Sequence, residues 1–347
     1  MKNFSLSKDI YSIIKSINLE ANSFNNKNIV ISGSFGFIGK YILECLLLIK
    51  KEMKLNFNVY AIDNFITSDE KIKSYFEEKG INCINHNINK KLNIDVEFDF
   101  IICLAGIASP YYYNKYPVET LNVSINGLKN MFELKHNTNS KFIFFSSSEI
   151  YGNPDKKNIP TKETYNGNVS SIQDRSCYDE GKRVGETLCY FYKIKQKIDV
   201  VIFRPFNVFG PGMPKNDYRV FPRFFNSIKN NRPITIFKNG KQTRTFCYVT
   251  DAITAMFLVI IKGKKFVYNI GNDYPEINMS NLHKIIERNI KKKIKYKNID
   301  YPSNYPQVEP QRRRPNINKI KKELNFKNIV TINDAIKKFY KWSKKYY

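Results

Sequence analysis

One segment near the N-terminus constrains the fold more than any other part of the chain. It reads KNIVISGSFGFIGKYILECLLLIKK over residues 27–51. Its apolar run, glycine-rich turn and amphipathic run predict a strand, a tight turn and a helix. Gly33, Gly36 and Gly39 occupy the turn with the spacing GxxGxxG. Glycines at such a turn allow backbone N–H groups and the helix N-terminus to approach a pyrophosphate, so the segment indicates a dinucleotide-binding fold.

A carboxylate at the end of the next apolar run indicates which dinucleotide binds. The run FNVYAID (57–63) ends in Asp63, 24 residues after Gly39. A carboxylate at this place accepts hydrogen bonds from the adenosine ribose and repels a 2′-phosphate, so we expect NAD as the cofactor in preference to NADP. The alternative is a glycine turn that only packs a helix, followed by an ordinary strand-end aspartate.

The order of strands and helices along the chain predicts the architecture. Apolar runs of strand length recur at 81–88, 98–106, 141–149 and 199–210. Helical stretches lie between and after them, at about 117–137 and 176–197. This alternation predicts an α/β protein with a Rossmann-type, doubly wound parallel sheet.

A change of pattern at about residue 211 predicts a second lobe. Pro, Gly and Asn become frequent there, and short strands mix with helices, at 234–237, 243–249, 250–261, 280–291 and 331–345. We therefore expect an N-terminal extension (1–26), an NAD-binding domain (27–210) and a smaller mixed α/β C-terminal lobe (211–347) that mainly holds the substrate. The chain is expected to cross between the two lobes.

Composition argues against several classes of function. Lys and Arg number 57 against 31 Asp and Glu, a formal net charge of +26, but the positive residues are spread along the chain. We therefore expect no nucleic-acid partner. Apolar runs too short for a bilayer and the lack of a secretory signal favour a cytoplasmic protein without membrane association. The six cysteines contain no CxxC pair and the three histidines are not clustered, so we expect neither disulfides nor a metal site.

Two residues one helical turn apart supply a candidate base. In CYDEGKR (177–183), Tyr178 and Lys182 fall on one face of a predicted helix. Alone, such a pair is more often a solvated surface contact. With NAD bound, however, an alcohol that gives up hydride must also lose its proton, and Lys182 with the positive nicotinamide would lower the pKa of the Tyr178 phenol from ~10. Ser147, in SSSEIYG (146–152) at a strand end, could hydrogen-bond the reacting oxygens.

Taken together, these motifs resemble those of the extended short-chain dehydrogenase/reductases, the NAD-dependent epimerase/dehydratase family that modifies nucleotide sugars. The resemblance covers about residues 28–336 and is strongest to UDP-glucuronate decarboxylase (UDP-xylose synthase). Blocks in family order carry it, among them LAGIASPYYYNKYPVETLNVSINGLKNM (104–131), SSSEIYGNP (146–154), RSCYDEGKRVGETLCY (175–190), GKQTRTFCYVTD (240–251) and RRRPNINK (312–319).

The resemblance implies a role for each matching residue. The residues that would contact NAD are Gly33, Gly36, Phe37, Ile38, Gly39, Asp63, Asn64, Asn87, Ile88, Leu104, Tyr178 and Lys182. The residues that would act in catalysis are Ser147, Glu149, Tyr178, Lys182 and Arg313. The residues that would hold the nucleotide sugar are Tyr113, Ser148, Arg175, Asn207, Arg219 and Arg244.

The reaction implied by the resemblance is an NAD-dependent decarboxylation. C4 of UDP-glucuronate is oxidised, the C5 carboxylate leaves as CO₂, and C4 is reduced again to give UDP-xylose. A homodimer formed through the helix of Tyr178 is also implied. The chain departs from the family pattern in having Ser147 for the usual Thr, Asn87 for the usual Asp and an acidic SDE (68–70) for a basic triplet.

Other functions stay open from the sequence. A nucleotide-sugar 4,6-dehydratase would share NAD and Tyr178 but needs an acid to expel the 6-hydroxyl, and many such enzymes carry Asp-Glu where this chain has Ser148-Glu149. The GDP-mannose type does carry Ser-Glu. A 4-epimerase usually lacks an acid at the Glu149 position. A non-catalytic basic protein that binds nucleic acid belongs to a different class, and no recognised nucleic-acid module is visible.

Overall fold

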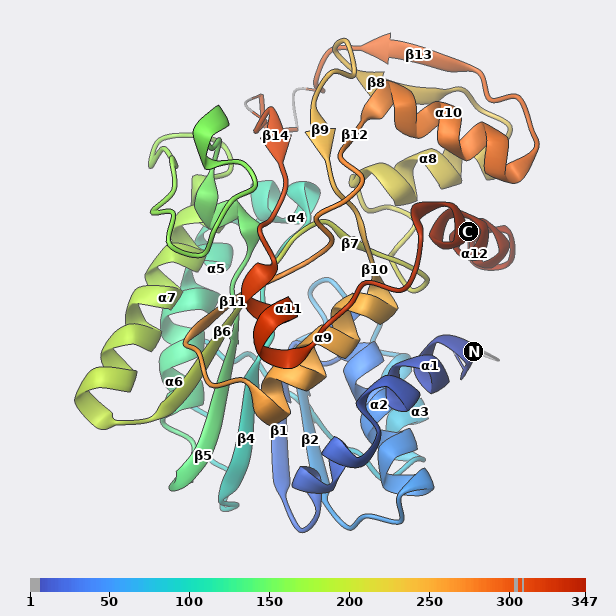
Figure 1. Ribbon diagram of the computed structural model, residues 1–347. Helices are drawn as coiled ribbons and strands as arrows, with labels where there is room; N and C mark the ends of the chain where they lie inside the picture. Colours follow the sequence, from blue (N-terminus) through green and yellow to red (C-terminus); the bar gives the residue numbers. More distant parts are fainter. Residues whose placement is uncertain (1–6, 303–304, 308) are drawn as a thin grey trace.

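A seven-stranded, all-parallel sheet forms the centre of the larger lobe (Figure 1). The computed structural model describes residues 7–302, 305–307 and 309–347. The strand order is β11-β6-β5-β4-β1-β2-β3. The strands are β1 (Asn28–Ser32), β2 (Asn58–Asp63), β3 (Asn82–Asn85), β4 (Phe98–Cys103), β5 (His136–Phe145), β6 (Asp199–Pro205) and β11 (Val267–Ile270). In register, β1 aligns Ile29 with Val59 of β2 and with Phe100 of β4.

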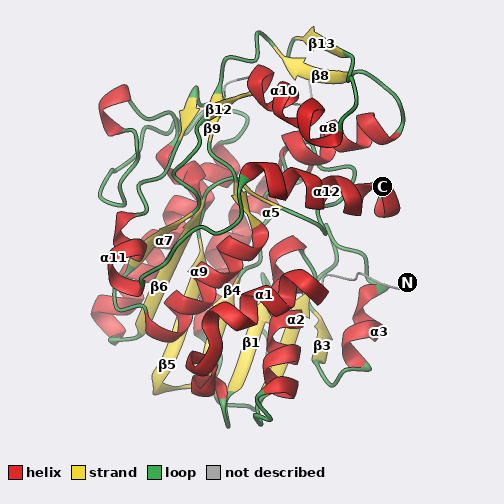
Figure 2. Ribbon diagram, turned by 45° about the vertical axis from the view of Figure 1, so that its right-hand side comes forward, coloured by secondary structure: helices red, strands yellow, loops and turns green. Residues whose placement is uncertain are grey.

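Helices cover both faces of this sheet, as the two ribbon views show (Figures 1 and 2). On one face lie α1 (Ser7–Ile17), α2 (Phe37–Glu52), α9 (Val249–Lys262) and α11 (Asn318–Leu324). On the other lie α5 (Pro117–Asn122), a π-helical turn (Val123–Gly127), α6 (Leu128–Phe132) and α7 (Ser176–Gln196). The short α3 (Ile72–Glu77) precedes β3, and α4 (Pro110–Lys115) follows β4. The prediction of a doubly wound parallel α/β sheet is therefore confirmed.

The described residues of the smaller lobe form three short sheets. β7 (Val208–Phe209) pairs with β10 (Cys247–Tyr248), and β8 (Ile234–Phe237) pairs with β13 (Tyr296–Ile299). β9 (Thr243–Arg244) lies between β12 (Ile277–Asn278) and β14 (Arg312–Arg313). The helices of this lobe are α8 (Val220–Lys229), α10 (Met279–Ile290) and α12 (Ile332–Tyr346). Helix α9 covers the large sheet, and β11 is one of its strands. The chain therefore returns to the large sheet after α8 and β8 of the smaller lobe.

Some element boundaries differ from those expected from sequence. The helix expected at 117–137 ends at Phe132, because β5 begins at His136 and not at 141. The strand expected at 243–249 is divided into β9 and β10, which pair with different partners. The strand expected at 199–210 is interrupted at Asn207, whose φ is 41°. Apolar runs locate strands, but tertiary pairing decides where each one stops.

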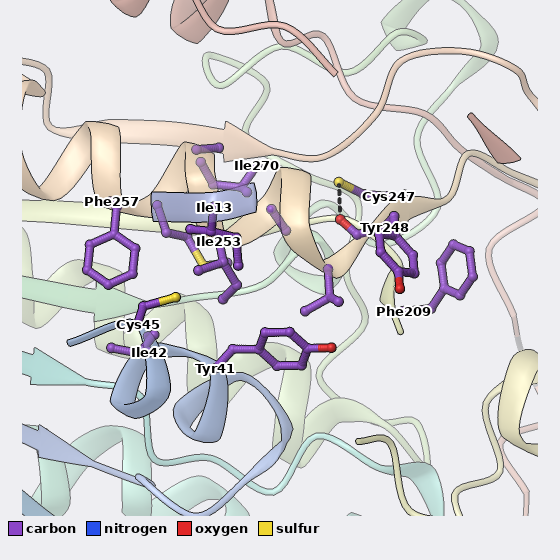
Figure 3. Close-up of a cluster of buried hydrophobic side chains, with 14 of the residues drawn as sticks. Ile13, Tyr41, Ile42, Cys45, Phe209, Cys247, Tyr248, Ile253, Phe257 and Ile270 are labelled. Atoms are coloured by element: carbon purple, nitrogen blue, oxygen red, sulfur yellow. Dashed lines mark hydrogen bonds between the residues drawn. The ribbon is translucent and has the colours of Figure 1, made fainter. Parts of the chain in front are cut away.

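The segment expected to be an N-terminal extension is part of the hydrophobic core from residue 7 onward; residues 1–6 lie outside the described part. Helix α1 packs against α2 and α9, and Ile10, Ile13 and Ile17 are buried in the main cluster. Figure 3 shows Ile13 beside Ile253 of α9. Asp9 accepts hydrogen bonds from the Tyr248 hydroxyl (2.6 Å) and Lys338 Nζ (2.9 Å), which ties α1 to the other lobe. The apolar face of α1 at helical spacing was the signal that was overlooked.

We predict that Ile13→Ala lowers the free energy of unfolding by about 2–5 kcal/mol, because the substitution leaves a cavity at a fully buried position. Tyr11→Ala is the matched control, since Tyr11 lies in the same helix and is 60% exposed. Chemical denaturation of both variants measures the difference. Equal stability of the two would show that α1 does not belong to the cooperative core.

Candidate active site

A cleft at the carboxyl ends of β1, β2, β3 and β4 brings together the residues expected to bind the dinucleotide. Ten of the expected residues line it: Gly33, Gly36, Phe37, Ile38, Gly39, Asp63, Asn64, Asn87, Ile88 and Leu104. They come from four separate stretches of the chain. The cleft therefore lies where open parallel sheets bind their ligands.

Two glycines of the turn are required because the backbone packs too closely there for a side chain. A Cβ at Gly33 would lie 2.6 Å from Ala105 Cα, and the residue has a φ of +71°. A Cβ at Gly39 would lie 2.3 Å from the Ser34 carbonyl oxygen. Helix α2 begins at Phe37, so its free N–H groups face the same turn. The turn has the backbone approach and the helix N-terminus that NAD requires.

Asp63 is held in place by three hydrogen bonds. Its carboxylate accepts from Phe35 N (2.9 Å), Phe65 N (2.9 Å) and Ser68 Oγ (3.0 Å). Each carboxylate oxygen has more than one lone pair, so these bonds leave acceptor capacity for a ribose. Asp63 is thus a fixed negative charge in the wall of the dinucleotide cleft.

A second cleft adjoins the first and contains most of the residues expected to act on the substrate. Expected residues in its lining are Tyr113, Glu149, Arg175, Tyr178, Asn207, Arg219, Arg244 and Arg313. Ala108 and Arg219 line both clefts, so the two are joined. Ser147, Ser148 and Lys182 lie outside the lining of either cleft and are buried behind it.

Tyr178 is buried against Tyr113, with the two rings stacked at 5.8 Å. Burial raises the pKa of Tyr178, while its hydrogen bond with Ser147 and the charges of Arg219 and Arg175 oppose the rise. In the protein alone, burial therefore disfavours the phenolate more than its neighbours favour it. The lowered pKa expected with the positive nicotinamide bound stays a prediction.

Lys182 reaches the wall of the dinucleotide cleft from behind. Its Nζ donates to the Phe145 carbonyl (2.7 Å) and lies 5.9 Å from the centre of the Tyr178 ring. A Cβ at Gly106, which lines that cleft, would be 3.0 Å from this Nζ. Burial lowers the pKa of Lys182 to about 8. The spacing of Tyr178 and Lys182 on α7 thus places one beside the substrate cleft and the other beside the dinucleotide cleft.

Glu149 is the centre of a buried ion-pair cluster. Its two carboxylate oxygens accept from the two terminal nitrogens of Arg313, each at 2.6 Å, and one of them also accepts from Arg175. Arg175 Nε donates to Asp179 (2.8 Å) one helical turn away. Arg313, expected to act in catalysis, and Arg175, expected to hold the sugar, are therefore already paired with carboxylates of the chain itself.

The arginines expected to hold a diphosphate are paired in the same way. Arg244 donates to Glu309 (2.8 Å), and Tyr305 donates its hydroxyl proton to the other oxygen of Glu309 (2.9 Å). Arg219 Nε donates to Asp217 at 2.9 Å. Asn207 donates to the Thr245 carbonyl (2.9 Å) at the base of this cleft.

Sequence reasoning missed the acids of this cluster. Asp179 directly follows Tyr178 and lies four residues after Arg175, a helical spacing that would have revealed the pair. Glu309 and Asp217 gave no comparable signal for a function. Glu309 meets Arg244 only because β14 pairs with β9, and that pairing of short strands cannot be read from either stretch alone.

The fold and the two joined clefts define the class of protein: an NAD-dependent enzyme with a Rossmann sheet and a separate, arginine-rich substrate cleft. Residues 29–271 match the model of the NAD dependent epimerase/dehydratase family, and the chain belongs to this family. The protein modifies nucleotide sugars, and NAD is its cofactor.

Relatives of known name share most of the chain's length. The chain is 35% identical over 312 residues to UDP-glucuronic acid decarboxylase 3 of Arabidopsis thaliana, covering 90% of this chain and 87% of that protein. It is 33% identical to UDP-glucuronic acid decarboxylase 1 of Xenopus tropicalis, covering 90% and 71%.

Solved structures share the fold. UDP-glucuronic acid 4-epimerase from Bacillus cereus, in complex with UDP-glucuronic acid and NAD, superimposes with a TM-score of 0.73 at 25% identity, covering 92% of this chain and all 100% of that one. The dTDP-glucose 4,6-dehydratase of Streptomyces venezuelae with NAD bound superimposes with a TM-score of 0.77 at 16% identity, covering 91% of this chain and 96% of that one.

We predict that Asp63→Asn reduces the preference for NAD over NADP by about tenfold or more, because the fixed charge that repels a 2′-phosphate is lost. Calorimetric titration of both dinucleotides measures the ratio of dissociation constants. Asp69→Asn is the control, since Asp69 is exposed and does not line the cleft. An unchanged ratio in Asp63→Asn would remove this residue from cofactor selection.

Proposed function

We propose that the protein is a UDP-glucuronate decarboxylase that forms UDP-xylose. The named relatives at 33–35% identity support this choice within the family. The observation that carries it is the pair of buried arginines, Arg313 and Arg175, in the cleft that also contains Tyr178. A uronic-acid carboxylate that enters a partly dry pocket needs cations or several donors there.

The substrate carboxylate would compete with Glu149 for Arg313. Both are carboxylates, and a planar guanidinium offers its fork to one of them at a time. Glu149 keeps Arg175 as a partner when Arg313 turns to the substrate, so the exchange leaves no acid unpaired. With two arginines around one glutamate, one can bind the substrate while the other keeps Glu149 paired.

The chain's own residues supply the proton transfers. Tyr178 takes the proton of the C4 hydroxyl, with Ser147 as its hydrogen-bond partner, and returns it at the end of the cycle. NAD, when bound, would supply the hydride acceptor and donor for C4. Arg313 holds the carboxylate until CO₂ leaves and then helps to deliver a proton to C5, directly or through water. Lys182 lies where it can hold the ribose beside the dinucleotide cleft.

A 4,6-dehydratase is the weaker proposal. That reaction requires an acid that protonates the leaving 6-hydroxyl. Both oxygens of Glu149 accept from guanidinium groups, an arrangement that suits a carboxylate and not a neutral acid. A 4-epimerase of uronic acids stays the second candidate, because the Bacillus cereus structure pairs this fold with UDP-glucuronic acid.

Exposed apolar residues on α7 and α5 support a homodimer through these helices. Val184, Phe191 and Ile194 lie on one side of α7 at spacings of seven and three residues and are 36%, 50% and 47% exposed. Val118 of the neighbouring α5 is 64% exposed. We propose that a second copy of the chain covers this face.

No helix among the described residues is long and apolar enough to cross a bilayer.

We predict that the protein with NAD converts UDP-glucuronate to a product lighter by CO₂, and that Arg313→Ala reduces this turnover about a hundredfold or more while UDP still binds. Mass spectrometry of the product and calorimetric titration of UDP measure the two effects. Arg313→Lys should recover only part of the turnover, because a point charge lacks the planar fork.

The neighbours of Arg313 are its matched controls. Arg312 pairs with Glu276, and Arg314 donates to the Asp273 carbonyl; neither residue lines the cleft. Arg312→Ala and Arg314→Ala should therefore retain most of the turnover. A product of unchanged mass would instead indicate an epimerase, loss of water would indicate a dehydratase, and equal losses in all three alanine variants would reject the role of Arg313.

We further predict that the double variant Phe191→Asp, Ile194→Asp is a monomer, because buried carboxylates would destabilise an apolar interface. Light scattering after size-exclusion chromatography gives the mass. Ile329→Asp is the control, since Ile329 is 71% exposed and lies outside α5 and α7. A monomeric wild-type protein, or a dimer that survives the double substitution, would contradict the proposed interface.

A further inference from the structure

Five arginines line the substrate cleft, and they differ in how their charge is balanced. Arg175, Arg219, Arg244 and Arg313 each form an ion pair with a carboxylate. Arg223 does not: no carboxylate of the described residues is within ion-pair distance of it, although Glu309 contributes a longer-range charge. Its role is not explained by the internal pairing that accounts for the other four.

Arg223 is held in place by contacts that leave donors unused. Its guanidinium carbon lies 3.7 Å from the centre of the Phe237 ring, and one terminal nitrogen donates to Thr235 Oγ1 at 3.2 Å. Its Nε is buried and has no hydrogen-bond partner among the described residues. A guanidinium carries five N–H donors in its plane and no acceptor, so a group stacked on a ring presents donors at its edge.

The surroundings of Arg223 indicate which part of a ligand reaches it. Phe237 lies 4.9 Å from Tyr305, and the Tyr305 hydroxyl donates to Glu309, which in turn pairs with Arg244. Phe237 and Tyr305 also line the cleft. The end of the cleft that Phe237 and Tyr305 line is thus linked through Glu309 to Arg244, the residue expected at the diphosphate. In a nucleoside diphosphate sugar the base lies on the side of the diphosphate away from the sugar.

We propose that Arg223 selects the nucleobase of the substrate by donating hydrogen bonds to the C4 carbonyl oxygen of uracil. This inference rests on the proposed nucleotide-sugar function and names the base-recognition residue of the same cleft. Uracil has a carbonyl acceptor at C4, where cytosine has an amino donor. A group that only donates pairs with the first and leaves two donors facing each other with the second.

The cost of a wrong base follows from burial. A hydrogen-bond donor left without an acceptor in a dry pocket costs binding free energy. A site built to hydrogen-bond one group therefore rejects an analogue that lacks this group strongly. An apolar pocket discriminates less between ligands that differ only in size. Removal of the guanidinium removes both the gain with uracil and the penalty with cytosine.

The test compares UDP and CDP binding in the full-length protein by calorimetry, without turnover. Wild type should bind UDP about tenfold or more tightly than CDP, the scale for one arginine-to-base contact. Arg223→Met, which retains a long apolar stem without donors, should bring the ratio close to one. Arg232→Met is the matched control: Arg232 is exposed just before β8, and the ratio should be unchanged.

Three outcomes would overturn the proposal. Equal weakening of UDP and CDP in Arg223→Met, with their ratio retained, would place Arg223 at the diphosphate. Equal binding of the two nucleotides by wild type, or tighter binding of GDP than of UDP, would reject uracil as its partner. Arg223→Lys, which keeps the charge, gives a second folded variant in which the ratio should fall only in part.

These results are independent of the reaction. If the protein proves to be an epimerase but Arg223→Met loses discrimination between UDP and CDP, the inference holds and the decarboxylase proposal fails. If UDP-glucuronate loses CO₂ but the ratio is insensitive to Arg223, the proposed function holds and the inference fails.

Discussion

The ion pair between Glu149 and Arg313 joins two parts of the chain on which the substrate cleft depends. The residues are 164 positions apart: Glu149 follows β5 of the large sheet, whereas Arg313 lies on β14 of the small one. Burial of both ions carries a desolvation cost that their attraction only offsets when the geometry is good. Two bonds of 2.6 Å and the third contact from Arg175 satisfy that condition. The pair therefore links β14 to the end of β5 and keeps a cation in the cleft.

The same arrangement explains how a basic protein can have an orderly anion site. The chain has 26 more Lys and Arg than Asp and Glu, yet four of the five arginines in the cleft are matched with acids. A carboxylate beside each guanidinium orients it and limits the repulsion between neighbouring cations. The overall charge thus gives no information about this site. The local pairing does give information about the site, because each ion pair marks a cation to which an anionic ligand can bind in place of the chain's own carboxylate.

Local patterns identify residues of the dinucleotide cleft. Gly33 and Gly39 lie at the turn between β1 and α2, and Asp63 ends the next strand, so the information that singles them out is contained in one short stretch of the chain. Tyr178 and Lys182 were likewise found by their spacing on one helix. The direction of the pKa shift of Tyr178 was not predictable, because burial is set by α4 and the rings packed on it.

The rest of the site arises from contacts between distant segments. Glu309 and Asp217 are ordinary surface acids by sequence, and Arg223 is one basic residue among 57. Their places follow from how short strands of the small lobe pair, which carries too little local signal to be read in advance. Helix α1 is a different case, because its apolar face at helical spacing is a local signal, although the polar composition of the segment draws attention away from it.

The two clefts are electrostatically coupled through Arg219. It lines both of them, it pairs with Asp217 in the wall of the dinucleotide cleft, and its charge opposes the burial of the Tyr178 phenol. Because opposite charges interact over several ångströms in a buried site, any change at Arg219 acts on Asp217 in one cleft and on the Tyr178 phenol in the other. The clefts are therefore linked through one guanidinium group and not only through their shared lining.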